Sequence, residues 1–192
     1  TVTHEEVDRE HLGGASVHTT VSGVAHLAAH DEAQAMAFCR RLLGHLPQNN
    51  LSRPETLETT DPPDRRDEVL NDLIPAEPSQ PYDMHDVIST VVDDRDFFEI
   101  QPNWASNIIV GFARMGGQSV GVVGHQPSVL AGALDIDASD KAARFVRTCD
   151  AFNVPLLFLM DCPGFIVASA VEKQGIIRHA SKMMFSVAVA TR

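Results

Sequence analysis

The chain has 192 residues, of which 44% are hydrophobic and 21% are charged, and its formal net charge is −11. This length fits one ordinary domain or parts of two, and the apolar share is large enough for a buried core, which excludes wholesale disorder. No stretch has the roughly 18 consecutive apolar residues of a membrane-spanning helix, and a general nucleic-acid surface would need the opposite charge. The three cysteines, Cys39, Cys149 and Cys162, are widely spaced, which favours a reducing compartment over a disulfide framework.

The first segment, residues 1–48, is predicted to contain one strand-like stretch and one helix. Residues 16–21 are rich in Val and Thr, which favours β structure. Asp31 is a predicted helix N-cap, with Gln34 three residues further on. Apolar residues then recur at helical spacing until Pro47 ends the run.

The middle segment, residues 49–80, is predicted to be an acidic, proline-rich connector. Residues 49–100 hold fourteen acidic residues against four basic ones, whereas residues 1–48 hold six against three and residues 101–192 six against eight. Five prolines lie between Pro54 and Pro78, and proline restricts φ and has no backbone N–H donor. The short apolar run at 69–75 is expected to anchor the connector to a neighbouring element.

The last segment, residues 81–192, follows a regular plan. A helix is predicted over 84–92, and two apolar strands over 107–114 and 118–124 are joined by a tight turn at Gly116 and Gly117. A second helix is predicted over 139–152.

The plan continues with a fully apolar strand over 155–160, as expected for a strand buried on both faces. Ser169 and Glu172 then form a predicted capping box that opens one helix through Val189. The order β-β-α-β-α predicts an α/β domain with right-handed crossovers.

Short segments of the chain resemble, in order, the carboxyltransferase (beta) subunits of biotin-dependent acyl-CoA carboxylases, and those of propionyl-CoA carboxylase most of all. The similar segments are 12–15, 22–26, 82–84, 97–100, 107–114, 124–127, 134–136, 141–146, 149–155, 163–165 and 175–179. The resemblance implies an α/β fold of crotonase-like (ClpP/crotonase) β-β-α units. Residues 1–48 would be the C-terminal end of a first carboxyltransferase domain, and 81–192 the N-terminal part of a second.

The resemblance also implies an enzyme that transfers CO₂ from carboxybiotin to the α-carbon of propionyl-CoA or a similar short acyl-CoA. Biotin would be carried on a partner subunit and would bring the carboxyl group, while acyl-CoA would be the substrate and no metal would be needed in this subunit. Backbone N–H groups preorganised as oxyanion holes would stabilise the charge that develops on both partners.

Two groups of candidate site residues follow from the resemblance. The resemblance associates the stretch from Phe97 to about Pro127 with acyl-CoA binding, and its predicted binding residues are Asn107, Phe112, Arg114 and Gln126. For Arg114 the expected contact is with the CoA phosphates, because a guanidinium pairs with phosphates in a fork geometry. The predicted wall on the biotin side consists of Pro163, Gly164, Phe165 and Gly175. Without the resemblance, Arg114 would be interpreted as a surface residue at a strand end, and the wall as an ordinary strand-to-helix turn.

No catalytic residue is predicted within the chain itself. The Gly-rich oxyanion segments of the two domains are expected upstream of Thr1 and downstream of Arg192, so this fragment is expected to be inactive alone. His125 and His179 could act as general bases, but lone histidines are more often structural. Many relatives carry Gly where this chain has Ala168, which would matter if the position required positive φ.

The implied partners are a biotin carboxylase/biotin carrier alpha subunit and further copies of the chain, in a homo-oligomer expected to be a hexamer. Neither nucleic acid nor a membrane is an expected partner. The compartment would be the cytoplasm in a bacterium and the mitochondrial matrix in a eukaryote. Two alternatives remain open: a biotin-dependent acyl-CoA decarboxylase subunit coupled to a membrane pump, and a non-catalytic crotonase-fold fragment that serves assembly.

Overall fold

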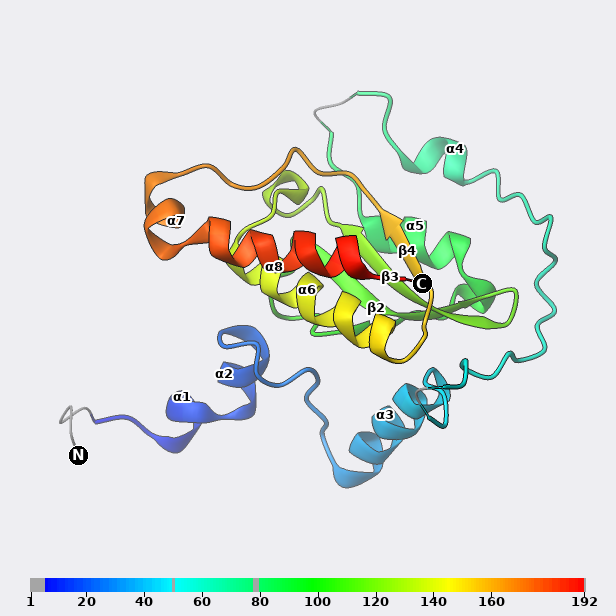
Figure 1. Ribbon diagram of the computed structural model, residues 1–192, viewed down its shortest axis with the longest axis horizontal. Coiled ribbons are helices and arrows are strands. Elements are labelled where there is room, and N and C mark those ends of the chain that lie inside the picture. Colours follow the sequence, from blue (N-terminus) through cyan, green and yellow to red (C-terminus); the bar gives the residue numbers. More distant parts are fainter. Residues whose placement is uncertain (1–5, 50, 78–79, 192) are drawn as a thin grey trace.

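The computed structural model describes residues 6–49, 51–77 and 80–191, and its centre is one four-stranded sheet (Figure 1). The strands are β1 (Phe98–Ile100), β2 (Ile108–Met115), β3 (Gln118–His125) and β4 (Leu156–Leu159), and they lie in the order β1-β2-β3-β4. β2 runs antiparallel to both of its neighbours, β1 and β3, whereas β4 runs parallel to β3. The predicted α/β class and the order of its elements are confirmed, but β1 had not been predicted as a strand.

The hairpin between β2 and β3 is confirmed as a two-residue turn. Met115 pairs with Gln118, and the intervening Gly116 and Gly117 have φ angles of 58° and 78°. Two consecutive positive φ angles fit the twist of a tight hairpin, and glycine adopts them without steric cost. The carboxylate of Asp93 accepts hydrogen bonds from both glycine N–H groups, at 3.0 and 2.7 Å.

Helices cover both faces of the sheet, because side chains along β2 alternate between them. Val110 and Phe112 point toward α6 (Ile136–Ala151) and pack in one apolar cluster with its residues, including Phe145. Ile109 and Ala113 point the other way and pack against α5 (Met84–Val91). The last helix, α8 (Ile176–Val189), packs on α6 (Figure 1).

Several helix ends differ from the sequence-based expectation. α6 begins at Ile136 rather than Ser139, because the Asp135 carboxylate caps it by accepting a hydrogen bond from the N–H of Ala138 at 2.8 Å. The single helix predicted over 169–189 is two helices, α7 (Ser169–Gln174) and α8, since Gly175 adopts a left-handed conformation with φ 90°. The predicted capping box at Ser169 is wrong, because the N-cap is Ala168 and no side chain caps the helix.

Each regular element in the described part of the N-terminal segment, residues 6–48, is a helix. The stretch predicted to favour β structure forms α2 (Ala15–Thr20), after the short α1 (Arg9–Gly13). The hydroxyls of Thr19 and Thr20 donate to the carbonyls of Ala15 and Ser16, both at 2.8 Å, so these β-branched residues satisfy their hydroxyl donors within the helix. The helix predicted at Asp31 is confirmed as α3 (Glu32–Gly44), with the Asp31 carboxylate accepting from Gln34 N–H at 2.8 Å.

β4 is less buried than its sequence indicates. Each of its four residues is partly exposed, because β4 lies at the edge of the sheet and has β3 as its one neighbour among the described residues. The prediction of a strand buried on both faces is therefore wrong for this chain. Phe158 of β4 borders a surface cleft, whereas the three leucines of the strand pack, partly buried, against the two apolar clusters.

The predicted connector runs around the outside of the sheet and contains a short helix, α4 (Leu70–Leu73) (Figure 1). Arg65 attaches it to the C-terminal end of α5, because its guanidinium donates to the carbonyls of Thr90 and Val92 at 2.7 and 3.2 Å. Residues 50, 78 and 79 of the connector lie outside the described residues. Among the described helices, none is both long and apolar enough to cross a membrane.

Candidate functional site

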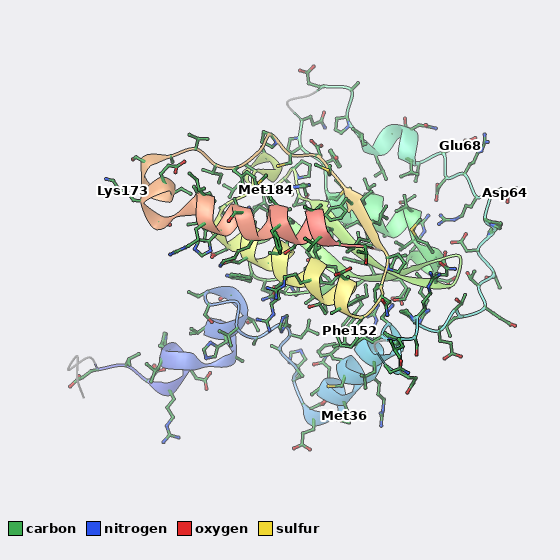
Figure 2. All side chains as sticks on the ribbon, viewed as in Figure 1. Met36, Asp64, Glu68, Phe152, Lys173 and Met184 are labelled. Atoms are coloured by element: carbon green, nitrogen blue, oxygen red, sulfur yellow. The ribbon has the colours of Figure 1, made fainter. Side chains whose placement is uncertain are left out.

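An apolar cleft of about 580 Å³ lies between the loop that follows β4 and the helix α8. Met184 of α8, labelled in Figure 2, belongs to its lining. This volume is within the range of small-molecule sites, about 300–1,000 Å³. The cleft is lined by His125, Leu134, Phe158, Met160, Cys162, Gly164, Phe165, Met183, Met184, Val187 and Ala188.

The loop after β4 is held against the segment that precedes α6. Leu134 N–H donates to the carbonyl of Gly164 at 3.0 Å, and Ile166 N–H donates back to the carbonyl of Leu134 at 2.9 Å. These two bonds form an isolated parallel bridge between Leu134 and Phe165. Gly164 has φ 123°, a conformation that L side chains rarely adopt, so a glycine is favoured where the backbone borders the cleft.

Asn107 holds the segment before α6 that pairs with this loop. Its side chain is 2% exposed, and its amide nitrogen donates to the carbonyl of Ala133 at 2.8 Å and to Asp135 Oδ1 at 3.3 Å. Asp135 is also the N-cap of α6. Asn107 therefore connects the start of β2 with the segment that pairs with Gly164 and Phe165.

The other predicted acyl-CoA-binding residues also have internal partners. Buried Gln126 accepts from the N–H of Met84 at 3.1 Å and donates to Asp83 Oδ1 at 2.6 Å. Phe112 stacks on His45 in the core, with 5.5 Å between ring centroids.

Arg114 lies beside the turn of the β2–β3 hairpin and connects it with two other backbone segments. Its guanidinium donates to the carbonyls of Gly44, Glu55 and Gly117, at 2.6, 3.0 and 2.9 Å. Arg114 and Asn107 lie at opposite ends of β2, so the structure does not bring the four predicted residues together. Direct contact of these side chains with acyl-CoA stays a prediction that this geometry does not support.

The predicted biotin-side residues divide into two pairs. Gly164 and Phe165 line the cleft, whereas Pro163 and Gly175 are not part of its lining. Gly175 instead ends α7, where its N–H donates to the carbonyl of Glu172 at 3.0 Å. Ala168 has φ −154°, an extended conformation open to any residue, so this position does not require positive φ and accommodates alanine without strain.

The two histidines considered as bases have different surroundings. His125 borders the cleft, is buried, and has a lowered pKa because burial disfavours its charged form. His179 lies outside the cleft, where its Nδ1 is 2.7 Å from Asp140 Oδ2. No cluster of three or more His, Cys, Asp or Glu side chains suited to a metal ion occurs among residues 6–49, 51–77 and 80–191.

The sequence analysis did not identify two cationic side chains, Lys141 and His85, that internal hydrogen bonds hold in place. Lys141 is fully buried in α6 and donates to four backbone carbonyls, and burial lowers its pKa to about 8. His85 lies between Glu99 and Asp83, and its hydrogen bond with Glu99, followed by that with Asp83, raises its pKa to about 9. A lysine within an apolar helical stripe was the one available signal for Lys141, and no local pattern marked His85.

Comparison with known proteins places this fold in a family. Residues 1–192 match the carboxyl transferase domain family. The chain is 52% identical to the methylmalonyl-CoA decarboxylase subunit alpha of Veillonella parvula, over 99% of this chain and 37% of that protein. It is 51% identical to the mitochondrial propionyl-CoA carboxylase beta chain of Sus scrofa, over 99% of this chain and 35% of that protein.

Solved structures agree with the sequence comparison. The transcarboxylase 12S hexamer crystallised with methylmalonyl-coenzyme A superposes with a TM-score of 0.96 at 43% identity, covering 99% of this chain and 37% of that one. The chain thus spans slightly more than a third of the length of these relatives. With the family matched along its whole length and half of its residues shared with these relatives, the chain belongs to the carboxyl transferase domain family and has its crotonase-like α/β fold.

Proposed function

We propose that the chain is part of the carboxyltransferase component of a biotin-dependent acyl-CoA carboxylase. The reaction moves CO₂ from carboxybiotin to the α-carbon of propionyl-CoA or a similar short acyl-CoA. The family and the half-identical propionyl-CoA carboxylase beta chains support this assignment. The observation that carries it is the apolar cleft bordered by Gly164, Phe165 and α8.

The lining of the cleft fits the ring system of biotin, which brings the carboxyl group when it is bound. Gly164 has no side chain, so a ligand approaches the backbone closely at this point. Phe165, Met183 and Met184 offer apolar surface, and the flexible methionines adapt to an irregular shape. These four residues would hold the ring on the biotin side of the cleft.

The role of the described lining residues is positional. Neither an acidic side chain nor a Lys or Arg lines this cleft among the described residues, and buried His125 favours its neutral form. The lining therefore binds and orients the carboxyl donor through apolar contacts.

The proposed partners are a biotin carboxylase/biotin carrier alpha subunit and further copies of the chain, in a hexamer. A hexamer assembly is described for transcarboxylase 12S. The outer face of α8 also presents apolar side chains, with Ile177 72% and Phe185 67% exposed, and large exposed apolar patches mark interaction surfaces. The corresponding compartment is the cytoplasm in bacteria or the mitochondrial matrix in eukaryotes.

A decarboxylase is the second candidate function. The Veillonella parvula relative, a methylmalonyl-CoA decarboxylase subunit, is as similar to this chain as the propionyl-CoA carboxylase chains are. The two enzymes would use the same fold and differ in the subunits that co-purify. Absence of both activities from the complete assembly would favour the third reading, a non-catalytic assembly fragment.

The deciding experiment is a carboxylation assay on the full-length protein with its biotin-bearing partner. Acetyl-CoA, propionyl-CoA and butyryl-CoA are compared, and propionyl-CoA is expected to give the highest kcat/KM. With free biotin as acceptor in the reverse direction, Phe165→Ala should raise the KM for biotin about tenfold or more, because aromatic contact area is lost.

A matched substitution outside the cleft completes the assay. Leu51→Ala removes an exposed apolar side chain from the connector and should leave the KM for biotin unchanged. The KM for acyl-CoA should change in neither variant. Equal KM values for biotin in the Phe165→Ala and unaltered proteins would refute the placement of biotin in this cleft.

A further inference from the structure

A second cavity, of about 370 Å³, lies between α3 and α6 and shares no lining residue with the cleft described above. Its walls are mainly apolar, with Leu42, Leu46, Phe112, Phe145 and Phe152 among them. Phe152, at the C-terminal end of α6, is labelled in Figure 2 near α3. The volume lies within the range of small-molecule sites, about 300–1,000 Å³.

The rim of this cavity is positively charged. Arg144 lines both the cavity and an adjoining surface groove of about 640 Å³, which also contains Arg147 and Lys182. Arg144 and Arg147 are three residues apart on α6 and therefore project from the same side of the helix. Neither guanidinium has a hydrogen-bond or ion-pair partner among residues 6–49, 51–77 and 80–191.

Among the described residues, one carboxylate lines the groove, and its charge is already neutralised. Asp140 binds Lys182 at 2.9 Å through one oxygen and His179 at 2.7 Å through the other. No Asp or Glu side chain lines the cavity itself in the part of the chain that the structure describes. The two free guanidiniums are therefore available to an anion from outside.

Two further titratable residues line the cavity. Lys141 is part of the wall, and its ammonium donates hydrogen bonds to backbone carbonyls. His26 is also part of the wall, and burial, with the charge of Arg144 as a second cause, lowers its pKa. A bound anion would oppose the effect of Arg144 and raise the pKa of this imidazole.

We propose that the cavity is a binding site for an amphipathic anion, whose carboxylate or phosphate head binds Arg144 and whose apolar tail lies between Leu42 and Phe145. The planar guanidinium offers a fork of donors that matches both kinds of head group. Burial of the tail supplies affinity, since each CH₂ group that is removed from water adds to it. This site goes beyond carboxyl transfer and does not depend on the function proposed above.

Calorimetric titration of the full-length protein tests the site with defined probes. Octanoate and octyl phosphate represent the two head groups, butanoate shortens the tail, and octan-1-ol removes the charge. Octanoate or octyl phosphate is expected to bind at least tenfold more tightly than either butanoate or octan-1-ol. The stronger of the two anions identifies the head group that the site prefers.

Two substitutions, each of which removes one arginine charge, test where the anion binds. Arg144→Gln should weaken binding of the preferred anion at least tenfold, whereas Arg40→Gln, which removes an exposed charge from α3 outside the cavity, should change it less than twofold. A separate readout uses the unaltered protein: the His26 imidazole pKa, followed by NMR and assigned with His26→Gln, should rise when octanoate is bound.

Three results would overturn the proposal. One is equal affinity for octan-1-ol and both anions, which would leave no role for the positive rim. Another is an equal effect of Arg144→Gln and Arg40→Gln. The third is the absence of any octanoate or octyl phosphate binding to the unaltered full-length protein, which would mean that other parts of the molecule fill the cavity.

Discussion

At the scale of single residues, the buried Lys141 ammonium organises the loop between β1 and β2. It donates to the carbonyls of Gln101, Trp104 and Ile108 at 2.9, 2.8 and 2.8 Å, and to Ala105 at 3.3 Å. Gln101 and Ala105 have positive φ angles, 56° and 47°, which turn their carbonyls toward one point. An ammonium bonded this way satisfies acceptors that would otherwise be buried without donors.

Lys141→Met should therefore reduce the free energy of unfolding by about 3 kcal/mol or more, because several buried carbonyls lose their donor. Urea unfolding followed by circular dichroism measures this change. Lys182→Met is the matched control, because the half-exposed Lys182 makes a surface ion pair with Asp140. This substitution should lower the free energy of unfolding by less than about 1 kcal/mol. A loss of similar size in both variants would contradict the role assigned to Lys141.

His85 gives the protein a pH-dependent contact between α5 and β1. Its ring nitrogens are 2.7 Å from Asp83 and 3.0 Å from Glu99, and the hydrogen bond with Glu99 is the main cause that raises its pKa to about 9. Because the folded-state pKa lies above the unfolded value of about 6.5, this contribution is complete below pH 6.5 and is lost as the pH rises through 9.

NMR titration of the His85 ring should accordingly show a midpoint near 9. Replacement by glutamine should remove the part of the stability loss that occurs between pH 6.5 and 9. His11→Gln serves as the comparison, because the exposed His11 bonds to Asp8 within one short N-terminal helix. A midpoint near the ordinary value of 6.5 would show that the two carboxylates do not hold the proton.

At the scale of elements, the loop after β4 depends on a chain of hydrogen bonds that starts in β2. Asn107 binds Ala133 and Asp135, and Leu134 between them pairs with the backbone of Gly164 and Ile166. Asn107 is thus a positioning residue for the cleft wall. Its side chain acts through the segment before α6 rather than by touching a ligand.

Asn107→Ala should loosen this wall without unfolding the domain. We expect the KM for free biotin to rise several-fold while the KM for acyl-CoA stays constant, and the amides of Leu134 and Ile166 to exchange faster with deuterium. Asn71→Ala, at an exposed position in α4, should alter neither quantity. Unchanged exchange at both amides in the Asn107 variant would contradict the positioning role.

The elements that the sequence predicted well are those with local signals. The hairpin follows from Gly116 and Gly117 between alternating apolar residues, and α3 follows from its Asp31 cap. The errors have two different causes. The exposure of β4 depends on its place at the sheet edge, which no local pattern shows, whereas α2 is a helix despite the β preference of its residues.

Prediction of the site was limited by contacts between residues that lie far apart in the sequence. Gly164 and Phe165, which the resemblance to the family marked, lie on one short loop and line the cleft, and their contact with biotin stays a prediction. The contacts of Asn107, Arg114 and Lys141 reach 26 to 70 residues along the chain. A pattern of neighbouring residues does not indicate such partners, so their supporting roles emerged only from the fold.

At the scale of the whole molecule, the connector is attached to the sheet domain rather than loose around it. The carbonyls of Thr90 and Val92 end α5 and accept hydrogen bonds from Arg65, whose Nε also contacts Asp61 at 2.6 Å. Leu57 N–H donates to the carbonyl of Gly117 at the hairpin turn, at 3.0 Å. Composition had indicated an acidic, proline-rich connector, but it showed only the acids and prolines and not the partners of Arg65.

Removal of the Arg65 contact should therefore release the connector while leaving the sheet domain folded. We expect Arg65→Ala to be cleaved in the connector several-fold faster by a glutamate-specific protease, because opening of the segment governs its cleavage. The thermal midpoint should change little. Arg66→Ala is the matched control: it removes the same charge one position along, from an exposed side chain, and should be cleaved at the rate of the unaltered protein. Equal cleavage rates for the two variants would show that the acidic connector is held by its other contacts, with Arg65 as a dispensable one.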